Sequence, residues 1–414
     1  MEFAKKCKYD VFVAGGGVAG VAAALQAARC NKKAVVIEKS TQLGGLATIG
    51  LINLFVPMCN GRGVQIIKGM AEEFLQLSVK YGFDTIPDDW KNGEPGYGNT
   101  TQRYVTRYSA PIFSLVLCKL LTDAGVDIMF DTVITDARCT NGHIDGAVVY
   151  NKSGYSYYEA DMFVDASGDS DLLHFAGVPT VTGGNFHTYT AFLATLDSCK
   201  KVAETGDMAH LASYVAGGKA NLYGGGHPEG MKLWDGTNGD DVSEYLRINQ
   251  LEVFENIKDD ERKSRDITLL PIMPQFRTTR RIDGDYTLKA EDAYRHFDDS
   301  VCAVCDFDRR DYLYEIPLSS MVKEGFDNVI AAGRCVCASG YAWDVVRVIP
   351  PAILTGQAAA MAVCLAIDSG CAIGDVDITT LQKNLESANV EVHFDDALVP
   401  EDKQAEEKCD IGHI

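Results

Sequence analysis

The chain carries near its start the run Tyr9-Asp10-Val11-Phe12-Val13-Ala14-Gly15-Gly16-Gly17-Val18-Ala19-Gly20, then an alanine-rich segment, then Ala34-Val35-Val36-Ile37-Glu38. This order predicts a strand, a glycine turn, a helix, a second strand and an acid. Gly15, Gly17 and Gly20 fit G-x-G-x-x-G, in which glycines make the turn, admit a pyrophosphate and let helix pack on strand. Glu38 is placed to accept ribose hydroxyls and would repel a 2′-phosphate. The stretch predicts a dinucleotide site, for either NAD or FAD.

Length and charge bound the class of protein. The chain has 414 residues, enough for two or three domains, and 46% of them are hydrophobic. With 38 basic and 58 acidic residues the net charge is −20. Because phosphate backbones and anionic membranes repel such a surface, we expect no nucleic acid partner and no membrane partner.

Targeting and cysteine usage favour a cytoplasmic protein. The first predicted strand begins by Tyr9, which leaves too few residues ahead of it for a signal peptide. The weakly polar run 350–367 is mostly alanine, so we interpret it as a buried helix and not as a membrane span. Thirteen cysteines without regular spacing fit reduced thiols better than a disulfide framework.

A second glycine pair, Gly44-Gly45, follows the acid closely. More backbone would approach the same ligand there, which favours FAD with its additional flavin over NAD. An ordinary glycine loop is the alternative.

The middle of the first half alternates helices and strands. We predict helices at 63–81 and 111–124, with an irregular segment at 82–108 that is either a lid or a surface excursion with aromatic anchors. Short strands form a meander, with Asn141-Gly142 as a hairpin turn, at 126–130, 133–139, 143–150, 155–159 and 162–164.

Later motifs complete a family pattern. After the meander comes Asp165-Ala166-Ser167-Gly168-Asp169, a strand at 326–332 ends in Gly333-Arg334, and Arg347-Val348-Ile349-Pro350 opens a long helix. With these motifs the chain resembles FAD-dependent oxidoreductases that have a glutathione-reductase-type FAD domain, in a bacterial branch distantly like the fumarate-reductase flavoproteins. It departs from that family at Ala360, where glycine is usual, and only loosely follows it at 336–341.

The resemblance implies an α/β fold: a discontinuous Rossmann-like FAD-binding domain, with a parallel sheet and a β-meander, and an inserted mixed α+β substrate domain. We predict the FAD domain at 1–180 and 321–370, the substrate domain at 181–320, and a C-terminal helix with a polar tail at 371–414. Asp377 is the expected N-cap of that helix. The implied cofactor residues are Gly15, Gly17, Val18, Ala19, Gly20, Glu38, Lys39, Gly44, Gly45, Leu46, Ala47, Val133, Ala166, Gly168, Gly333, Arg334, Val348 and Ile349.

Candidate catalytic residues lie in the second half. Flavin supplies the hydride chemistry, so the protein has to position a small-molecule substrate and manage a proton. His187 is the candidate acid or base, although a lone histidine is often structural. Arg277 and Arg347 are candidate clamps for a carboxylate, and Tyr341 either lines the flavin pocket or fills core.

Other chemistries find little support. The pair Cys302 and Cys305 lacks the four-ligand spacing of a zinc or iron–sulfur site, so we predict no metal. No second G-x-G-x-x-G appears, which leaves the electron donor or acceptor unidentified. We predict an FAD-dependent oxidoreductase; the alternatives are an NAD-dependent dehydrogenase and a non-catalytic flavin-binding subunit.

Overall fold

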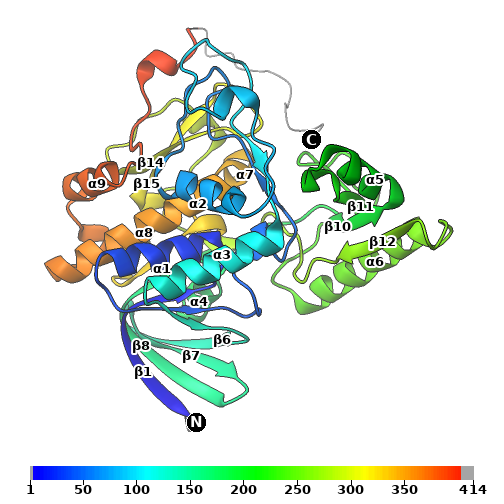
Figure 1. The fold of residues 1–414 in the computed structure, drawn as a ribbon. Helices are drawn as coiled ribbons and strands as arrows, with labels where there is room; N and C mark the ends of the chain where they lie inside the picture. Colours follow the sequence, from blue (N-terminus) through cyan, green and yellow to red (C-terminus); the bar gives the residue numbers. More distant parts are fainter. Residues whose placement is uncertain (1–2, 402–414) are drawn as a thin grey trace.

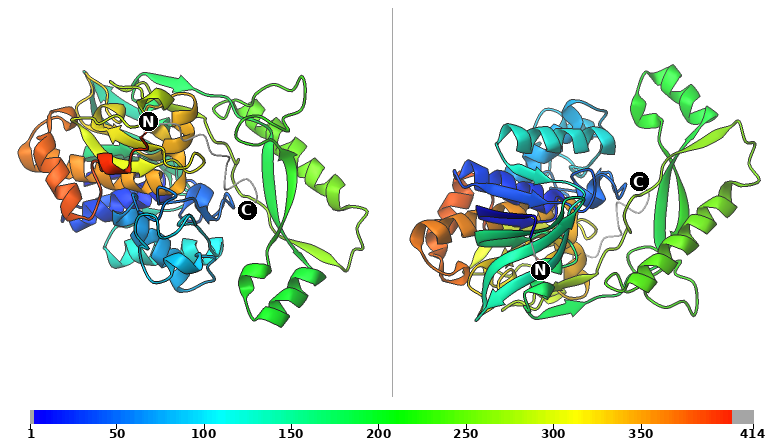
Figure 2. Two further views of the ribbon diagram at one scale, coloured as in Figure 1. Left: turned by 90° about the horizontal axis from the view of Figure 1, so that it is seen from above. Right: turned by 90° about the horizontal axis from the view of Figure 1, so that it is seen from below.

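The computed structural model describes residues 3–401, so the polar tail predicted at 402–414 lies outside the described residues. The chain forms a main body and a smaller lobe that stands off from it in every view (Figures 1 and 2). We call residues 188–269 the lobe. The helices are α1 (Val18–Arg29), α2 (Gly69–Lys80), α3 (Ala110–Asp123), α4 (Asp171–Phe175), α5 (Leu196–Thr205), α6 (Gly239–Ile257), α7 (Tyr341–Arg347), α8 (Ile349–Ser369) and α9 (Ile378–Ser387).

The main sheet of the described chain has seven strands, with the order β5-β2-β1-β8-β7-β6 and β16 also paired with β8. Strands β5, β2, β1, β8 and β16 run parallel, while β6 and β7 pair antiparallel. The bounds are β1 (Lys5–Ala14), β2 (Ala34–Ile37), β5 (Asp127–Met129), β6 (Val133–Thr140), β7 (His143–Asn151), β8 (Gly154–Asp165) and β16 (Val329–Ala331). The predicted α/β class, with a parallel sheet and a meander, is confirmed.

Two layers of core cover the two faces of this sheet. On β1, Val11 and Val13 point into one hydrophobic cluster and Phe12 and Ala14 into the other, and all four are fully buried. This is why the strand is apolar at every position there and does not alternate. Helices α1, α2, α3 and α8 pack on one another above the sheet (Figure 1).

Helix α8 is the one described helix that is long and apolar enough to span a membrane, and 94% of its most apolar window is buried inside the protein. It packs against α1 so closely that a side chain at Gly356 would meet the carbonyl of Ala19 at 2.1 Å. This supports our interpretation of the segment as a buried helix.

Several predicted elements shift in the structure. The strand at 126–130 is not part of the meander, because β5 pairs in parallel with β2 at the sheet edge. The strands at 155–159 and 162–164 are the single strand β8. The helix predicted at 63–81 begins only at Gly69, since Ile66 and Ile67 are buried in extended chain before it. Apolar spacing marks burial equally well in both conformations.

Other local predictions are confirmed. Asn141 and Gly142 both have positive φ, at 52° and 82°, in the turn between β6 and β7. Asp377 caps α9 by accepting the backbone N–H of Thr380 at 2.9 Å. In the irregular segment 82–108, Trp90 is buried and stacks on Tyr104 at 4.8 Å, the arrangement of a surface excursion with aromatic anchors.

The lobe has its own sheet and its own core. Strands β10 (Thr188–Thr195), β11 (Ser213–Lys219) and β12 (Arg265–Leu269) form an antiparallel sheet that packs on α6 around Tyr189, Trp234 and Tyr245. The chain enters and leaves the lobe through paired strands, β9 (Thr180–Thr182) and β13 (Arg280–Ile282).

The remaining strands belong to the main body. They are β3 (Leu54–Phe55), which pairs with β4 (Thr106–Arg107), and β14 (Ser300–Cys305), which pairs with β15 (Leu313–Pro317). The side chains of β14 and β15 join the same hydrophobic cluster as α8. The substrate domain at 181–320 stays a prediction, and this cluster favours a narrower unit.

Candidate cofactor site

A cavity of about 300 Å³ lies where the parallel strands of the main sheet end. Its walls come from the turns that follow β1, β2, β8 and β16, together with the start of α8. The carboxyl edge of an open parallel sheet is where such folds bind ligands, because the turns there are free to present backbone groups.

Most predicted cofactor residues line this cavity. They are Gly15, Gly17, Val18, Ala19, Glu38, Lys39, Gly44, Gly45, Leu46, Ala47, Val133, Ala166, Gly168, Gly333, Arg334 and Ile349. Gly20 and Val348 are not part of the lining. Segments about three hundred positions apart in the sequence therefore meet at one cavity.

The three motif glycines have different surroundings. A Cβ at Gly15 would meet the carbonyl oxygen of Ala166 at 2.6 Å, and its φ of +92° also disfavours a side chain. A Cβ at Gly20 would meet the carbonyl oxygen of Gly15 at 1.9 Å, so this glycine serves helix packing. Around Gly17 no described atom lies within 4 Å of such a Cβ. The open space at Gly17 is where a pyrophosphate would lie at the start of α1.

Glu38 is buried, and backbone N–H groups hold its carboxylate on both oxygens. Oε2 accepts from Gly16 and Oε1 accepts from Ser40, both at 2.7 Å. Each carboxylate oxygen has further lone pairs, which can accept the two hydroxyls of a ribose. The orientation of this acid is fixed by the same glycine turn that admits the pyrophosphate.

The second glycine pair lies directly against the first. The backbone N–H of Gly44 donates to the carbonyl oxygen of Gly16 at 2.8 Å, and Gly17 and Gly44 form a β-bridge. Leu46 and Ala47 continue the wall from there. A ligand that reaches past the first turn meets this second stretch of backbone, as a dinucleotide with an additional flavin would.

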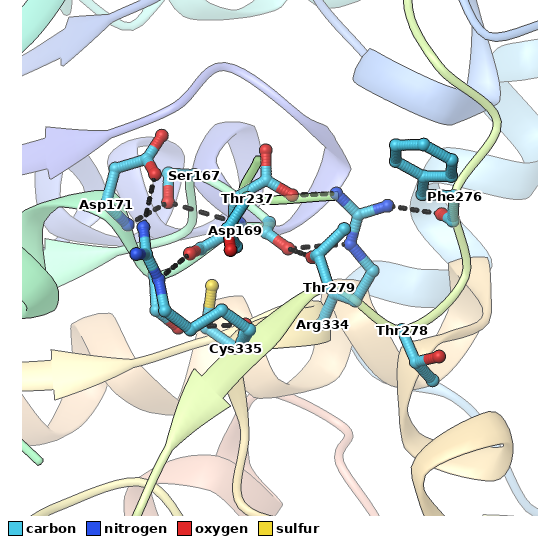
Figure 3. Close-up of polar contacts among 12 residues, drawn as sticks. Ser167, Asp169, Asp171, Thr237, Phe276, Thr278, Thr279, Arg334 and Cys335 are labelled. Carbon is cyan, nitrogen blue, oxygen red and sulfur yellow. Dashed lines mark hydrogen bonds and ion pairs between the residues drawn. The ribbon is translucent and has the colours of Figure 1, made fainter. Parts of the chain in front are cut away.

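Arg334 lines the cavity, but most of its N–H groups donate hydrogen bonds to other residues of the protein. Its Nε donates to the carbonyl oxygen of Gly168 at 2.7 Å, Nη1 to that of Phe276 at 2.6 Å, and Nη2 to Asp169 Oδ1 at 2.9 Å (Figure 3). Burial would raise the pKa of Asp169, but Arg334 and Lys39 beside it hold that pKa below its usual value. With three of five N–H groups used, Arg334 chiefly joins three chain segments behind the cavity.

The start of α8 closes one end of the cavity. Ile349 and Ala352 line it, and the N–H of Gly333 donates to Thr355 Oγ1 at 2.9 Å. Pro350 and Pro351 occupy the first turn, where a missing N–H costs no helical hydrogen bond. The partial positive charge of a helix start favours negative charge at this end.

Sequence reasoning missed several lining residues, chiefly Ile272, Met273 and Pro274 on the segment that returns from the lobe. The backbone N–H of Ile272 donates to the carbonyl oxygen of Ile49, and the side chain of Ile272 is 68% exposed. An apolar run with two prolines between two domains was the available signal. The other missed lining residues are Ile37, Ser40, Ile49, Thr132, Ile134, Ser167, Asp171, Ala332 and Ala352.

The two candidate catalytic arginines, Arg277 and Arg347, lie near each other. Arg347 lines the cavity and donates from Nε to Asp344 Oδ1 at 2.8 Å. Arg277 donates from Nη1 to the carbonyl oxygen of Asn221 at 2.8 Å, and no carboxylate in residues 3–401 forms an ion pair with it. Burial and the nearby positive charge of Arg347 lower the pKa of Arg277 to about 10. Arg277 is thus a partly desolvated cation without an anion of its own.

Arg277 is not part of the cavity lining, and neither are the other two candidates, His187 and Tyr341. His187 is 1% exposed inside the lobe, where Nε2 lies 2.9 Å from Glu252 Oε2 and Nδ1 lies 3.4 Å from Asn249 Nδ2. Tyr341 donates to Asp306 Oδ1 at 2.6 Å and its ring stacks on Tyr223. The geometry favours structural roles for both residues.

A second cavity of about 600 Å³ lies between the main body and the lobe. Its walls include Phe83, Ile112, Phe192 and Leu211. Tyr108 lines this cavity, and its hydroxyl donates to the carbonyl oxygen of Ala47, which lines the first cavity.

The fold and the cavity define a dinucleotide-binding flavoprotein of the Rossmann type, and comparison with known proteins agrees. The family model described as FAD dependent oxidoreductase matches residues 10–219 and 241–385. The chain belongs to this family, and its cofactor is FAD. The predicted membership of the FAD-dependent oxidoreductases is confirmed, whereas the bacterial branch stays a prediction.

Individual relatives are distant. Digeranylgeranylglycerophospholipid reductase 2 of Methanothermobacter thermautotrophicus is 26% identical over 185 residues, which cover 42% of this chain and 43% of the relative. A geranylgeranyl bacteriochlorophyll reductase-like structure from Thermoplasma acidophilum matches with 15% identity and a TM-score of 0.43, covering 95% of each chain. A p-nitrophenol 4-monooxygenase from Pseudomonas putida matches with 14% identity and a TM-score of 0.45, covering 92% of this chain and 84% of that one. We infer no substrate from them.

Proposed function

We propose that this chain is an FAD-dependent oxidoreductase that acts on a small organic molecule carrying an anionic group, and that Arg277 binds this group. The flavin, when bound, supplies the hydride transfer. The protein supplies the cofactor cavity and the charge that orients the substrate. The observation that carries the proposal is the guanidinium of Arg277, which has no carboxylate partner among the described residues.

The position of Arg277 supports this role. It lies three residues after Pro274, which lines the cavity, and Asn185 Oδ1 accepts its backbone N–H at 2.7 Å. Asn185 Oδ1 also accepts the N–H of Thr278, so the backbone around Arg277 is held by the chain that enters the lobe. A fixed guanidinium is suited to bidentate recognition of a carboxylate.

The charge balance also supports an anion here. Asp344 already pairs with Arg347, so two guanidinium groups share one carboxylate. Since a partly buried cation without an ion pair is unfavourable, a substrate carboxylate between the two would relieve that cost. The anion would enter beside the end of the cavity formed by Arg347 and Ile349.

The proposal also covers the substrate, the electron partner and the location of the protein. The substrate is a small molecule, the electron donor or acceptor is a separate species, and we propose a cytoplasmic location without nucleic acid or membrane partners. The substrate domain of 181–320 and the cofactor contacts of individual residues belong to the same proposal.

The test is anaerobic photoreduction of the purified holoprotein, followed by a spectroscopic screen of organic acids as acceptors and donors. We expect visible absorbance from bound FAD, and an organic acid that reoxidises or bleaches it. In Arg277→Gln the dissociation constant of that acid should rise about 10- to 100-fold, the range for a charge-assisted contact, with unchanged flavin content. Arg138→Gln, on the exposed meander, is the control.

Each outcome has a meaning. A protein without flavin and without affinity for it contradicts the cofactor assignment, and NAD binding in its place favours the dehydrogenase alternative. If no donor or acceptor reduces or reoxidises the bound flavin, the result favours the non-catalytic subunit. Equal acid binding in Arg277→Gln and the wild type contradicts the role of Arg277.

A further inference from the structure

Outside the cofactor site, three side chains from distant parts of the sequence converge on one point. They are His296, which precedes β14, Glu315 in the middle of β15, and His393 on the segment after α9. Each offers one nitrogen or oxygen atom, and these atoms lie within 4.8 Å of one another. Neither of the two described cavities is lined by any of them.

Glu315 is the centre of the cluster. It is fully buried, and its Oε1 lies 2.5 Å from Nδ1 of His296, while Oε2 lies 3.0 Å from Nδ1 of His393. The backbone N–H of Phe297 also donates to Oε2 at 2.8 Å and holds the carboxylate in place. Each of the two histidines therefore presents its Nδ1 atom to the buried carboxylate.

The histidines are held in position by their chain neighbours. Val392 and Phe394, on either side of His393, are buried, and the carbonyl oxygen of Val392 accepts the hydroxyl of Ser300 at 2.6 Å. The ring of His296 stacks on Phe394 at 4.3 Å. The two imidazoles are 41% and 42% exposed, so an ion can reach the cluster from solvent.

A further carboxylate stands behind one of the imidazoles. Asp396 Oδ1 lies 3.0 Å from Nε2 of His296, the nitrogen that points away from Glu315. Histidines that ligate a metal through one nitrogen usually donate the other N–H to a carboxylate, which fixes the tautomer. With Nε2–H donating to Asp396, Nδ1 of His296 is the nitrogen that can give up its proton and act as a ligand.

We propose that His296, Glu315 and His393 form a Zn²⁺ site, with Asp396 as the carboxylate that orients His296. Two imidazole nitrogens and one carboxylate oxygen are ligands that zinc accepts, and a water completes four-coordination. Zinc binding would release the protons between each Nδ1 and Glu315 to solvent, and the exposed imidazoles would move outward from Glu315 to admit the metal. Its effect is to tie the C-terminal segment at 390–396 to the β14–β15 hairpin.

The test is zinc binding by chelator-treated holoprotein, measured by competition with a metal indicator and by metal analysis after dialysis. We expect one Zn²⁺ per chain in the wild type. His393→Gln should weaken that binding about 100-fold, and Asp396→Asn about 10-fold, as expected for an outer carboxylate. His393 and Asp396 are exposed, and a glutamine at position 393 can still donate an N–H to Glu315, so we expect both variants to fold.

His143→Gln is the matched control, because this exposed histidine also pairs with a carboxylate, Asp327, at 2.8 Å but is not part of the cluster. Zinc should raise the melting temperature of the wild type and of His143→Gln, and not that of His393→Gln. The free cysteines are present in every variant, so zinc held by thiols appears equally in all. Equal zinc binding by wild type and His393→Gln, or no zinc bound at micromolar concentration, overturns the proposal.

Discussion

Two arginines near the cofactor site differ in how many partners the protein gives them. Arg334 is buried and donates to two carbonyl oxygens and to Asp169, so the protein accounts for its charge and most of its donors. Arg277 has one carbonyl partner, a neighbouring arginine and no ion pair within residues 3–401. The contacts of the first arginine lie within the fold, whereas the second is the one that we propose to bind a ligand.

The comparison gives a rule for the rest of the molecule. Buried polar groups are normally satisfied, and removing one partner of a buried pair costs more than the pair itself contributes. A group with all its partners inside the chain is therefore expected to matter for stability. A group or a space that the chain leaves without a partner is expected to matter for binding.

The largest expected effect is on the satisfied arginine. Arg334→Met leaves Lys39, at 3.4 Å, as the one cation paired with Asp169 in the described chain, and it removes the donor to the carbonyl oxygen of Phe276, so we expect a loss of about 3–4 kcal/mol in the free energy of unfolding. Arg277→Met should be at least as stable as the wild type, because it removes a desolvated cation beside Arg347. Urea unfolding of both variants measures this. Equal losses would break the comparison.

Asp165 is intermediate between these two arginines. Its carboxylate accepts hydrogen bonds, but no ion pair neutralises its charge in the described chain. It accepts the N–H groups of Ser167 and Leu173, both at 2.9 Å, and burial raises its pKa to about 6. A raised pKa means that the folded state holds the proton more tightly, so this contribution is complete below the usual pKa of 3.8 and is lost as pH rises through 6.

The expected size of that loss is about 2 kcal/mol of unfolding free energy between pH 4 and pH 7. Asp165→Asn cannot ionise, so its stability relative to the wild type should improve by that amount over the same range. Urea unfolding at several pH values between 4 and 7.5 measures the difference. Parallel curves for the two proteins would show that Asp165 keeps an ordinary pKa.

Gly17 tests the expectation that a space left empty by the chain matters for binding. Gly17→Val places its Cβ where, apart from its chain neighbours, no described atom lies within 4 Å, so the apoprotein should fold normally, with an unchanged circular dichroism spectrum. The same side chain fills the space of the pyrophosphate and should weaken FAD binding about 100-fold, or about 2.7 kcal/mol. Gly20→Ala should instead impair folding, because its Cβ would meet Gly15. Full flavin content in Gly17→Val would contradict this placement of the cofactor.

The smallest expected effect concerns His187, whose ring has its partners within the lobe. His187→Gln should lower the free energy of unfolding by about 1–2 kcal/mol, because a buried hydrogen bond to Glu252 is changed. Flavin reduction per folded molecule should change little. Stopped-flow reduction with the substrate found by the screen measures this, and a large loss of rate at full stability would restore the catalytic interpretation.

How far the sequence could be interpreted depends on whether a feature is local. The glycine turn after β1, the acid at Glu38, the Asn141-Gly142 turn and the cap at Asp377 each depend on neighbours a few positions away. By contrast, β5 joined the parallel sheet and not the meander, because a short apolar strand pairs equally well with either neighbour until the chain is packed.

The same reason limited the candidate site. Ile272 to Pro274 became cavity wall because the lobe returns the chain there. His187 turned inward because its ring lies against Trp234 and Tyr245. The zinc ligands we propose are 19 and 78 positions apart in sequence, so no spacing pattern marks them.

The amino-acid sequence by itself determined the family, the α/β class and the FAD cofactor, since glycines that must face a pyrophosphate and an acid that must face a ribose leave a local pattern. The tertiary structure alone decided which charges are neutralised. Whether an arginine stabilises the fold or awaits a ligand depends on which acceptors surround it, and those come from segments that meet only after folding.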